Sequence, residues 1–132
     1  MALLCPDAGE VTLFKYMLNH TAPSNWVLRL FTSNTTPAEA DTVATYTDAT
    51  EAGYAPITLT GTNFTVSTTA NVTTANYAEQ TFTFTTAATV YGYFYTNTAD
   101  SVALIAERFS GAPFTLPSGG GSLAITPAIT LD

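Results

Sequence analysis

The stretch Thr81-Phe82-Thr83-Phe84-Thr85 decides the fold class of this chain. Side chains alternate between the two faces of a β-strand, so both phenylalanines share one face and the threonines share the other. We therefore predict a half-buried strand that places Phe82 and Phe84 in the core. Threonine fills 27 of the 132 positions, and because it is β-branched it favours strands through much of the chain.

Further strand segments lie on both sides of this stretch, with turn residues between them. The continuously apolar segment 26–31 predicts a strand that is buried on both faces. Pro127 in the last segment indicates an edge position or a bulge. The expected strands are 26–31, 54–60, 64–66, 81–85, 90–95, 102–109 and 123–131, with connections at 33–53, 67–79, 97–100 and 111–121 and one helical turn near 40–46. This series predicts a mainly β fold, specifically a jelly-roll-like β-sandwich.

The N-terminal region differs because its apolar residues recur at helical spacing. Asp7 is the expected N-cap, with Glu10 three residues later as in a weak capping box. The apolar residues are Val11, Phe14, Met17 and Leu18. We predict a short helix over 7–20 that lays this stripe on a sheet.

Length and charge restrict the possible functions. A chain of 132 residues fits one domain, so we expect a single β-sandwich domain over 1–132, with 1–22 as an N-terminal helical arm. The formal net charge is -7, and Lys15, Arg29 and Arg108 are the only permanent cations. Binding nucleic acid or an anionic membrane takes several clustered cations, so neither is an expected partner.

Charged residues make up 10% of the chain, against about 25% in a typical soluble domain. A surface of Thr, Ser, Asn and Ala suits a subunit that neighbours cover. The N-terminus has neither a basic segment nor an apolar run long enough for a signal peptide. We therefore expect synthesis in the cytoplasm without export by the general route.

Nucleophiles and bases are few. Cys5 is the only cysteine and His20 the only histidine, so a thiol or serine nucleophile would have to use His20 as its base. We interpret Cys5 as a small apolar residue near an ordered N-terminus. His20 is interpreted as exposed, or as capping the C-terminal carbonyls of the helix.

Acidic and glycine-rich segments give no specific motif either. Asp41, Asp48 and Glu51 lack the spacing of a calcium loop and are interpreted as solvated loop charges, with a weak cation site as the alternative. Gly119-Gly120-Gly121 lacks the lysine and the helix of a phosphate-binding loop and is interpreted as a hairpin connection.

Glu79 and Glu107 are the only candidates for the facing carboxylates of a glycosidase. Arg108 follows Glu107, and neighbours on a strand point to opposite faces, so we expect Arg108 to pair with an acid on an adjacent strand. From all these groups we expect no catalytic residue, no metal and no cofactor.

An aromatic stripe is the most notable surface candidate. Tyr91, Tyr93 and Tyr95 are expected on one face of strand 90–95. The stripe is compatible with a core layer, a subunit interface or a platform for sugars.

Several segments carry a resemblance to a known class of proteins. They are Val90-Tyr91-Gly92-Tyr93-Phe94, Ala106-Glu107-Arg108-Phe109, Pro113-Phe114, Leu123-Ala124-Ile125-Thr126-Pro127, and Asp41-Thr42-Val43 through Gly53-Tyr54. With them the chain resembles, over residues 26–131, small virion proteins of tailed bacteriophages. The resemblance implies a capsid decoration (cement) protein: a β-rich subunit, commonly a homotrimer, that binds the major capsid protein on the outer surface of the virion. It implies no catalytic residue.

Two other functions compete with this one. Some similar proteins belong to tails or fibres, so a module that binds host surface glycans through Trp26, Tyr93 or the long loops is the alternative. A small enzyme such as a cell-wall hydrolase is disfavoured by the single histidine, the single cysteine and the lack of a paired-acid pattern.

Overall fold

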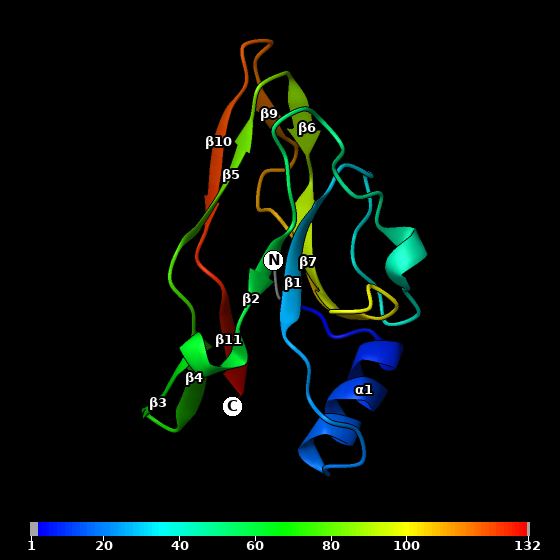
Figure 1. The fold of residues 1–132 in the computed structure, drawn as a ribbon, viewed down its shortest axis with the longest axis vertical. Helices are drawn as coiled ribbons and strands as arrows, with labels where there is room; N and C mark the ends of the chain where they lie inside the picture. The colour runs from blue at the N-terminus through cyan, green and yellow to red at the C-terminus, as the bar shows by residue number, and fades with distance from the viewer. Residues whose placement is uncertain (1–2, 132) are drawn as a thin grey trace.

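The computed structural model describes residues 3–131 and is mainly β, with one helix near the N-terminus (Figure 1). Helix α1 spans Asp7–Met17, and the one-turn 3-10 helices are η1 (Val43–Thr45) and η2 (Gly61–Asn63). The strands are β1 (Trp26–Phe31), β2 (Ile57–Leu59), β3 (Thr65–Thr69), β4 (Val72–Asn76), β5 (Gln80–Phe84), β6 (Ala88–Val90), β7 (Gly92–Asn97), β8 (Ala103–Arg108), β9 (Phe114–Leu116), β10 (Gly121–Ile125) and β11 (Ala128–Leu131).

The strands form several small antiparallel sheets. The largest has the order β2-β1-β7-β8, the next has the order β11-β4-β3, and β10 pairs with β5 and β6 with β9. The expected final strand 123–131 is instead two strands in different sheets, because buried Pro127 separates β10 from β11. Within the described residues, no helix has the length and apolar character needed to cross a membrane.

The four-stranded sheet is covered on both faces. One face packs side chains of β1 and β7 against side chains of β5 and β10 in a single core cluster. The other face carries Phe31 and Phe94, which pack against Tyr46 of the long connection 32–53. Strand β1 therefore has the burial pattern predicted for it, with four of its six residues buried. The prediction for β5 is also confirmed, since Phe82 is 2% exposed and Phe84 is 4% exposed.

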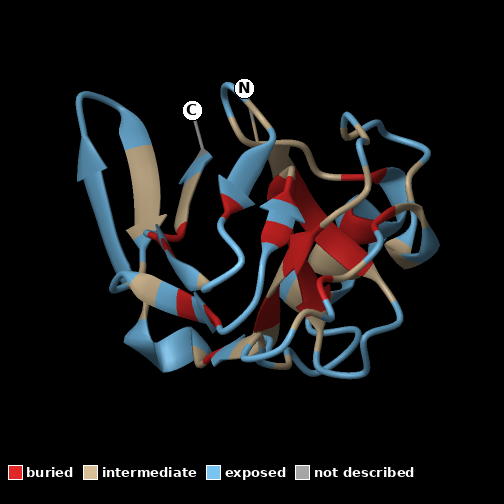
Figure 2. Ribbon diagram, turned by 90° about the horizontal axis from the view of Figure 1, so that it is seen from above, coloured by how far each residue is buried: buried red, intermediate tan, exposed pale blue. Residues whose placement is uncertain are grey.

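Residues 67–79 do not form the expected loop. Thr65–Thr69 and Val72–Asn76 pair as the hairpin β3–β4, which we call the hairpin arm. Ala70 and Asn71 connect the strands with φ of +52° and +68°, the combination that a two-residue type I′ turn requires. All five residues of β3 are exposed, so the arm projects from the body (Figure 2).

Two predictions about α1 are wrong. The N-cap is Pro6 and not Asp7, and this N-cap makes no side-chain hydrogen bond. The apolar stripe does not lie on the sheet but faces solvent: Val11 is 54% exposed, Phe14 61%, Met17 77% and Leu18 75%. The face that meets the body contains Gly9 and Leu13 instead. Gly9 decides the orientation, because its lack of a side chain lets the helix touch the backbone of β8.

Candidate interaction surface

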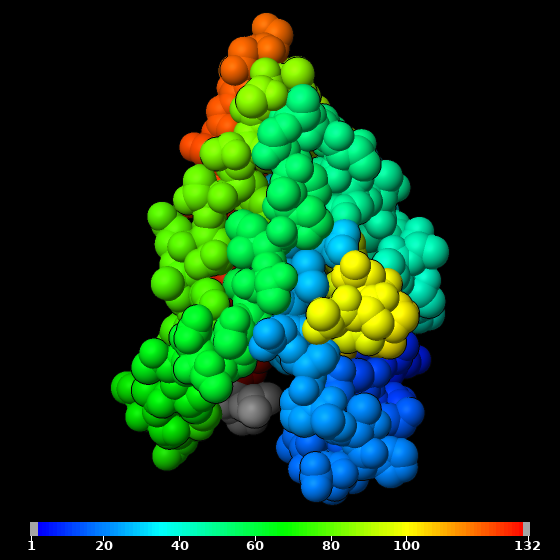
Figure 3. All heavy atoms as spheres, viewed as in Figure 1, coloured from blue at the N-terminus to red at the C-terminus, as the bar shows by residue number. Residues whose placement is uncertain are grey.

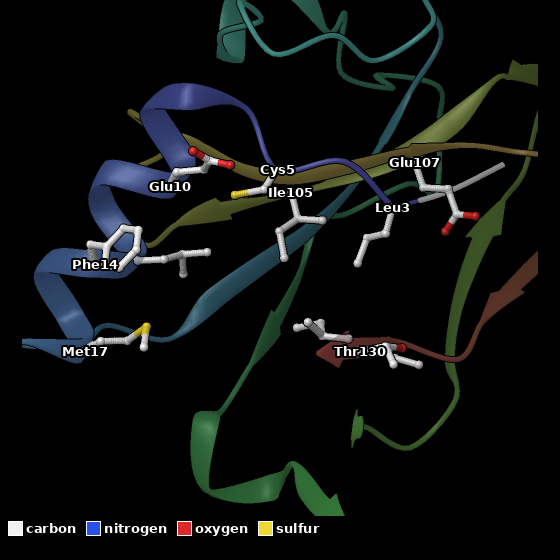
Figure 4. Close-up of a pocket in the computed structure, with 11 residues that line it drawn as sticks. Leu3, Cys5, Glu10, Phe14, Met17, Ile105, Glu107 and Thr130 are labelled. Atoms are coloured by element: carbon white, nitrogen blue, oxygen red, sulfur yellow. The ribbon is translucent and has the colours of Figure 1, made fainter. Parts of the chain in front are cut away.

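An apolar hollow of about 660 Å³ lies between α1 and β11 (Figure 4). Leu13, Phe14 and Met17 line it from the helix, and Ala128, Ile129 and Thr130 line it from the strand. The remaining lining residues are Leu3, Cys5 and Ile105, with two acids, Glu10 and Glu107.

A second hollow of about 410 Å³ shares Leu13, Met17, Ile105 and Ile129 with the first, so the two are continuous. It extends toward Trp26 and Phe64 and has no charged residue in its lining. We call the two hollows together the apolar cleft. Its residues come from five separate parts of the sequence, so no local pattern could have predicted it.

Strand β11 adds an open sheet edge to the cleft. It pairs with β4 on one side, and among residues 3–131 no strand pairs with its other side. Its free edge lies on the side of the sheet toward α1 (Figure 1). Unpaired N–H and C=O groups at such an edge are available to a further chain. The structure thus supports the expected exposed edge in the last part of the chain.

Exposed apolar side chains border the cleft. Helix α1 and the hairpin arm form two separate projections at one end of the molecule (Figure 3). The helix contributes Phe14 and Met17, which line the first hollow and are largely exposed. Clustered exposed apolar side chains beside a hollow are characteristic of sites where another molecule binds.

Cys5 is a poor nucleophile although it lines the cleft. Its thiol donates a hydrogen bond to the carbonyl oxygen of Leu104 over 3.1 Å. Burial, and then the negative charge of Glu10, raise the pKa of this thiol to about 11. The group is therefore a neutral thiol at neutral pH. The His20 side chain is exposed, in agreement with its interpretation as a surface residue beyond the helix.

The acids of the long connection are more than solvated charges, which corrects the prediction for two of them. Asp48 forms an ion pair with Arg29 and accepts a hydrogen bond of 2.7 Å from the Tyr54 hydroxyl. Asp41 accepts a hydrogen bond of 2.8 Å from the hydroxyl of Tyr46. The ion pair of Asp48 with Arg29 fastens the connection to β1, and the Asp41–Tyr46 hydrogen bond lies within the connection itself.

Arg29 also binds Asp100 over 2.6 Å. Burial alone would lower the pKa of Arg29, but the hydrogen bonds and charges of Asp100 and Asp48 outweigh that effect and raise it. Glu51 accepts a hydrogen bond from the backbone N–H of Thr50. In residues 3–131 no three His, Cys, Asp or Glu side chains come together in a way that could hold a metal ion.

The tyrosine stripe does not exist as predicted. Tyr93 and Tyr95 are buried in the main core, but Tyr91 packs on the opposite face of the sheet. The strand is interrupted at Tyr91, between β6 and β7, and this break shifts the alternation. Of the three open interpretations, a core layer is correct for Tyr93 and Tyr95.

Glu107 and Arg108 are occupied within the fold. Glu107 accepts a hydrogen bond from the Tyr93 hydroxyl. Arg108 donates to the backbone carbonyl of Thr35 over 3.0 Å and lies over the ring of Tyr91, so its predicted pairing with an acid is wrong. Glu79 is exposed just before β5.

Gly119-Gly120-Gly121 connects β9 to β10, and Gly120 has a φ of +76°. Because β9 pairs with β6 and β10 pairs with β5, the segment is a turn between two sheets and not the hairpin connection that was predicted.

No protein-family model, curated protein or solved structure matches this chain. The apolar cleft, the free edge of β11 and the exposed face of α1 are therefore the features from which a function has to be inferred.

Proposed function

We propose that this chain is a structural protein of a tailed-bacteriophage virion. In this proposal it is a capsid decoration (cement) subunit, a homotrimer that binds the major capsid protein lattice on the outer surface of the head. The chain would be made in the host cytoplasm and would carry no catalytic activity, metal or cofactor.

One observation carries the proposal: the exposed apolar stripe of α1 stands beside an apolar cleft and an open sheet edge. Protein–protein interfaces are depleted of charge at their centre, and only Glu10 and Glu107 are charged among the residues that line the cleft. A chain with 10% charged residues and this much exposed apolar surface suits permanent coverage by neighbours.

We further propose that the two packed groups of strands, β2-β1-β7-β8 and β5-β10, are the layers of a jelly-roll-like β-sandwich. One core cluster contains side chains of both groups, which supports this description. Residues 1–22 would act as a helical arm attached to the single domain.

The burial and bonding of the other candidate residues also favour a structural role. Tyr93 and Tyr95 are buried and offer no platform to a glycan. The Cys5 thiol is neutral and bonded to the backbone. A decoration subunit needs neither group, because it stabilises the shell by mass action: it binds the assembled lattice and not the free capsid protein.

The test uses virions from which this chain has been deleted. Purified wild-type chain is added to such heads, and bound copies are counted by quantitative gel densitometry and located by electron microscopy. We expect saturation at hundreds of copies per head and greater resistance of the filled head to heat. If the chain leaves heads bare and binds host cells or their glycans, it is a tail or fibre module.

A further inference from the structure

Helix α1 has two apolar faces on opposite sides. Gly9 and Leu13 face the body, whereas Val11, Phe14 and Leu18 lie roughly 160° away around the helix axis, at 3.6 residues per turn. A helix with one apolar stripe buries that stripe by packing on its own domain. The second stripe of α1 therefore lacks a partner within the described part of the chain.

The spacing of the second stripe is that of a helix-to-helix seam. Val11, Phe14 and Leu18 are separated by three and then four residues, the spacing of a and d positions in a coiled coil. In this frame Glu10 and Lys15 occupy the flanking g and e positions. Both side chains are exposed, and they lie five residues apart, too far around the helix to face each other.

The charges that flank the seam favour a second copy of α1 as the partner, in a parallel orientation. When two copies of α1 lie parallel, Glu10 of one copy faces Lys15 of the other, because g and e′ positions meet in that arrangement. When they lie antiparallel, like charges meet across the seam. Arg29 and Arg108 are engaged within the fold, so Lys15 is the cation that remains exposed for such a contact.

We propose that α1 is the contact between copies of this chain, and that the helices of neighbouring copies pack in parallel around a common rotation axis. Val11, Phe14 and Leu18 form the seam, and each interface contains a Glu10–Lys15 ion pair between copies. This inference rests on the homo-oligomer of the proposed function and names the surface that makes it.

The surface around α1 adds the buried interface area that a short helix alone does not supply. A stable interface buries about 800 Å² on each partner, more than three helical turns supply. The hollow of about 660 Å³ adjoins the Glu10 flank of the helix and has room for side chains of the next copy. Parallel packing also turns the same face of every copy in one direction, which suits a complex that sits on a lattice.

The experiment measures the mass of the full-length chain by light scattering after gel filtration, and its dissociation constant by sedimentation equilibrium. The wild type should be a trimer, and a dimer would also support the contact. Phe14→Ser should give monomers, because it removes the centre of the seam. The matched control is Val66→Ser on the hairpin arm, an equally exposed apolar residue outside the seam, which should not change the mass.

Exchanging the charges of Glu10 and Lys15 tests whether the two helices lie parallel and whether these residues pair between copies. Glu10→Lys and Lys15→Glu should each raise the dissociation constant by about tenfold, since every interface exchanges an attraction for a repulsion. The double variant E10K/K15E should return to within about threefold of the wild type. Far-UV circular dichroism checks that each variant is folded.

A monomeric wild type, or a double variant that stays as weak as the single ones, would overturn the proposed contact. A monomer that still decorates heads would reject the homotrimer but leave the decoration role standing, and would point to the capsid protein as the partner of α1. A stable trimer that leaves heads bare would reject the decoration role and keep the helix contact.

Discussion

Gly9 lies so close to Leu104 that a Cβ on the glycine would come within 2.4 Å of the carbonyl oxygen of Leu104. The obstacle is backbone of β8, which cannot rotate away. Alanine is ordinarily favoured over glycine in a helix by about 1 kcal/mol. At this position the steric conflict outweighs that preference, so the glycine is required for α1 to dock.

We expect Gly9→Ala to lower the free energy of unfolding by about 2 kcal/mol or more, because α1 must move away from β8. Urea denaturation measures the change. Gly61→Ala is the control, since a Cβ there meets nothing within 4 Å, and its effect should stay within about 0.5 kcal/mol. A stabilised Gly9→Ala variant would contradict the docking geometry.

Phe84→Ala should cost about 3–5 kcal/mol, because it removes a core ring that stacks on Tyr54 and leaves a cavity. The same denaturation experiment on Phe114→Ala provides the comparison, since Phe114 is 42% exposed. That change should cost less than about 1.5 kcal/mol. A loss below about 1 kcal/mol for Phe84→Ala would place its face of β5 in solvent.

Stability should decrease in alkaline solution. Burial is the main reason why the pKa values of Cys5, Tyr46, Tyr54 and Tyr93 are raised in the folded state. The unfolded chain releases these protons near pH 8.5 for cysteine and near pH 10 for tyrosine. Above those values it holds fewer protons than the folded chain, so the free energy of unfolding falls as the pH rises.

Denaturation midpoints measured between pH 8 and pH 11 check this expectation, and tyrosinate absorbance reports the ionisation itself. A midpoint that stays constant across this range would show that these hydroxyls ionise as easily in the folded state as in the unfolded one.

If the chain is the virion protein proposed above, His20→Ala should leave virion assembly and infectivity near wild-type levels. The His20 side chain is exposed. Plaque counts and particle yields measure the outcome. Loss of infectivity by a normally folded variant would indicate a chemical role for the only imidazole and would contradict the structural function.

The alternation of apolar and polar residues predicted the strands that have one apolar and one polar face. Phe82 and Phe84 could be placed in the core because threonines separate them, and segment 26–31 could be placed centrally because it is apolar throughout. The hairpin arm was missed because its strands are mostly threonine, serine and asparagine, without a clear apolar face, and its turn, Ala70-Asn71, contains no glycine.

Helical spacing identified the stripe of α1 but assigned it to the wrong side. Periodicity states which residues share a face, and it does not state which face meets the domain. The close approach of Gly9 to β8 decided that question, and it depends on a strand about 95 residues away in the sequence. For the same reason the apolar cleft, built by residues that only the fold brings together, could not be predicted.

The hairpin arm has a consequence for how this chain can vary. A buried face normally fixes strand register, because a slip of one residue would expose the core side chains. Strand β3 is exposed along its whole length, so its pairing with β4 depends on the turn at Ala70 and Asn71. One inserted residue there would exchange the two faces of the arm and leave the core unchanged. A change of this kind would alter what the arm touches without altering how the domain folds.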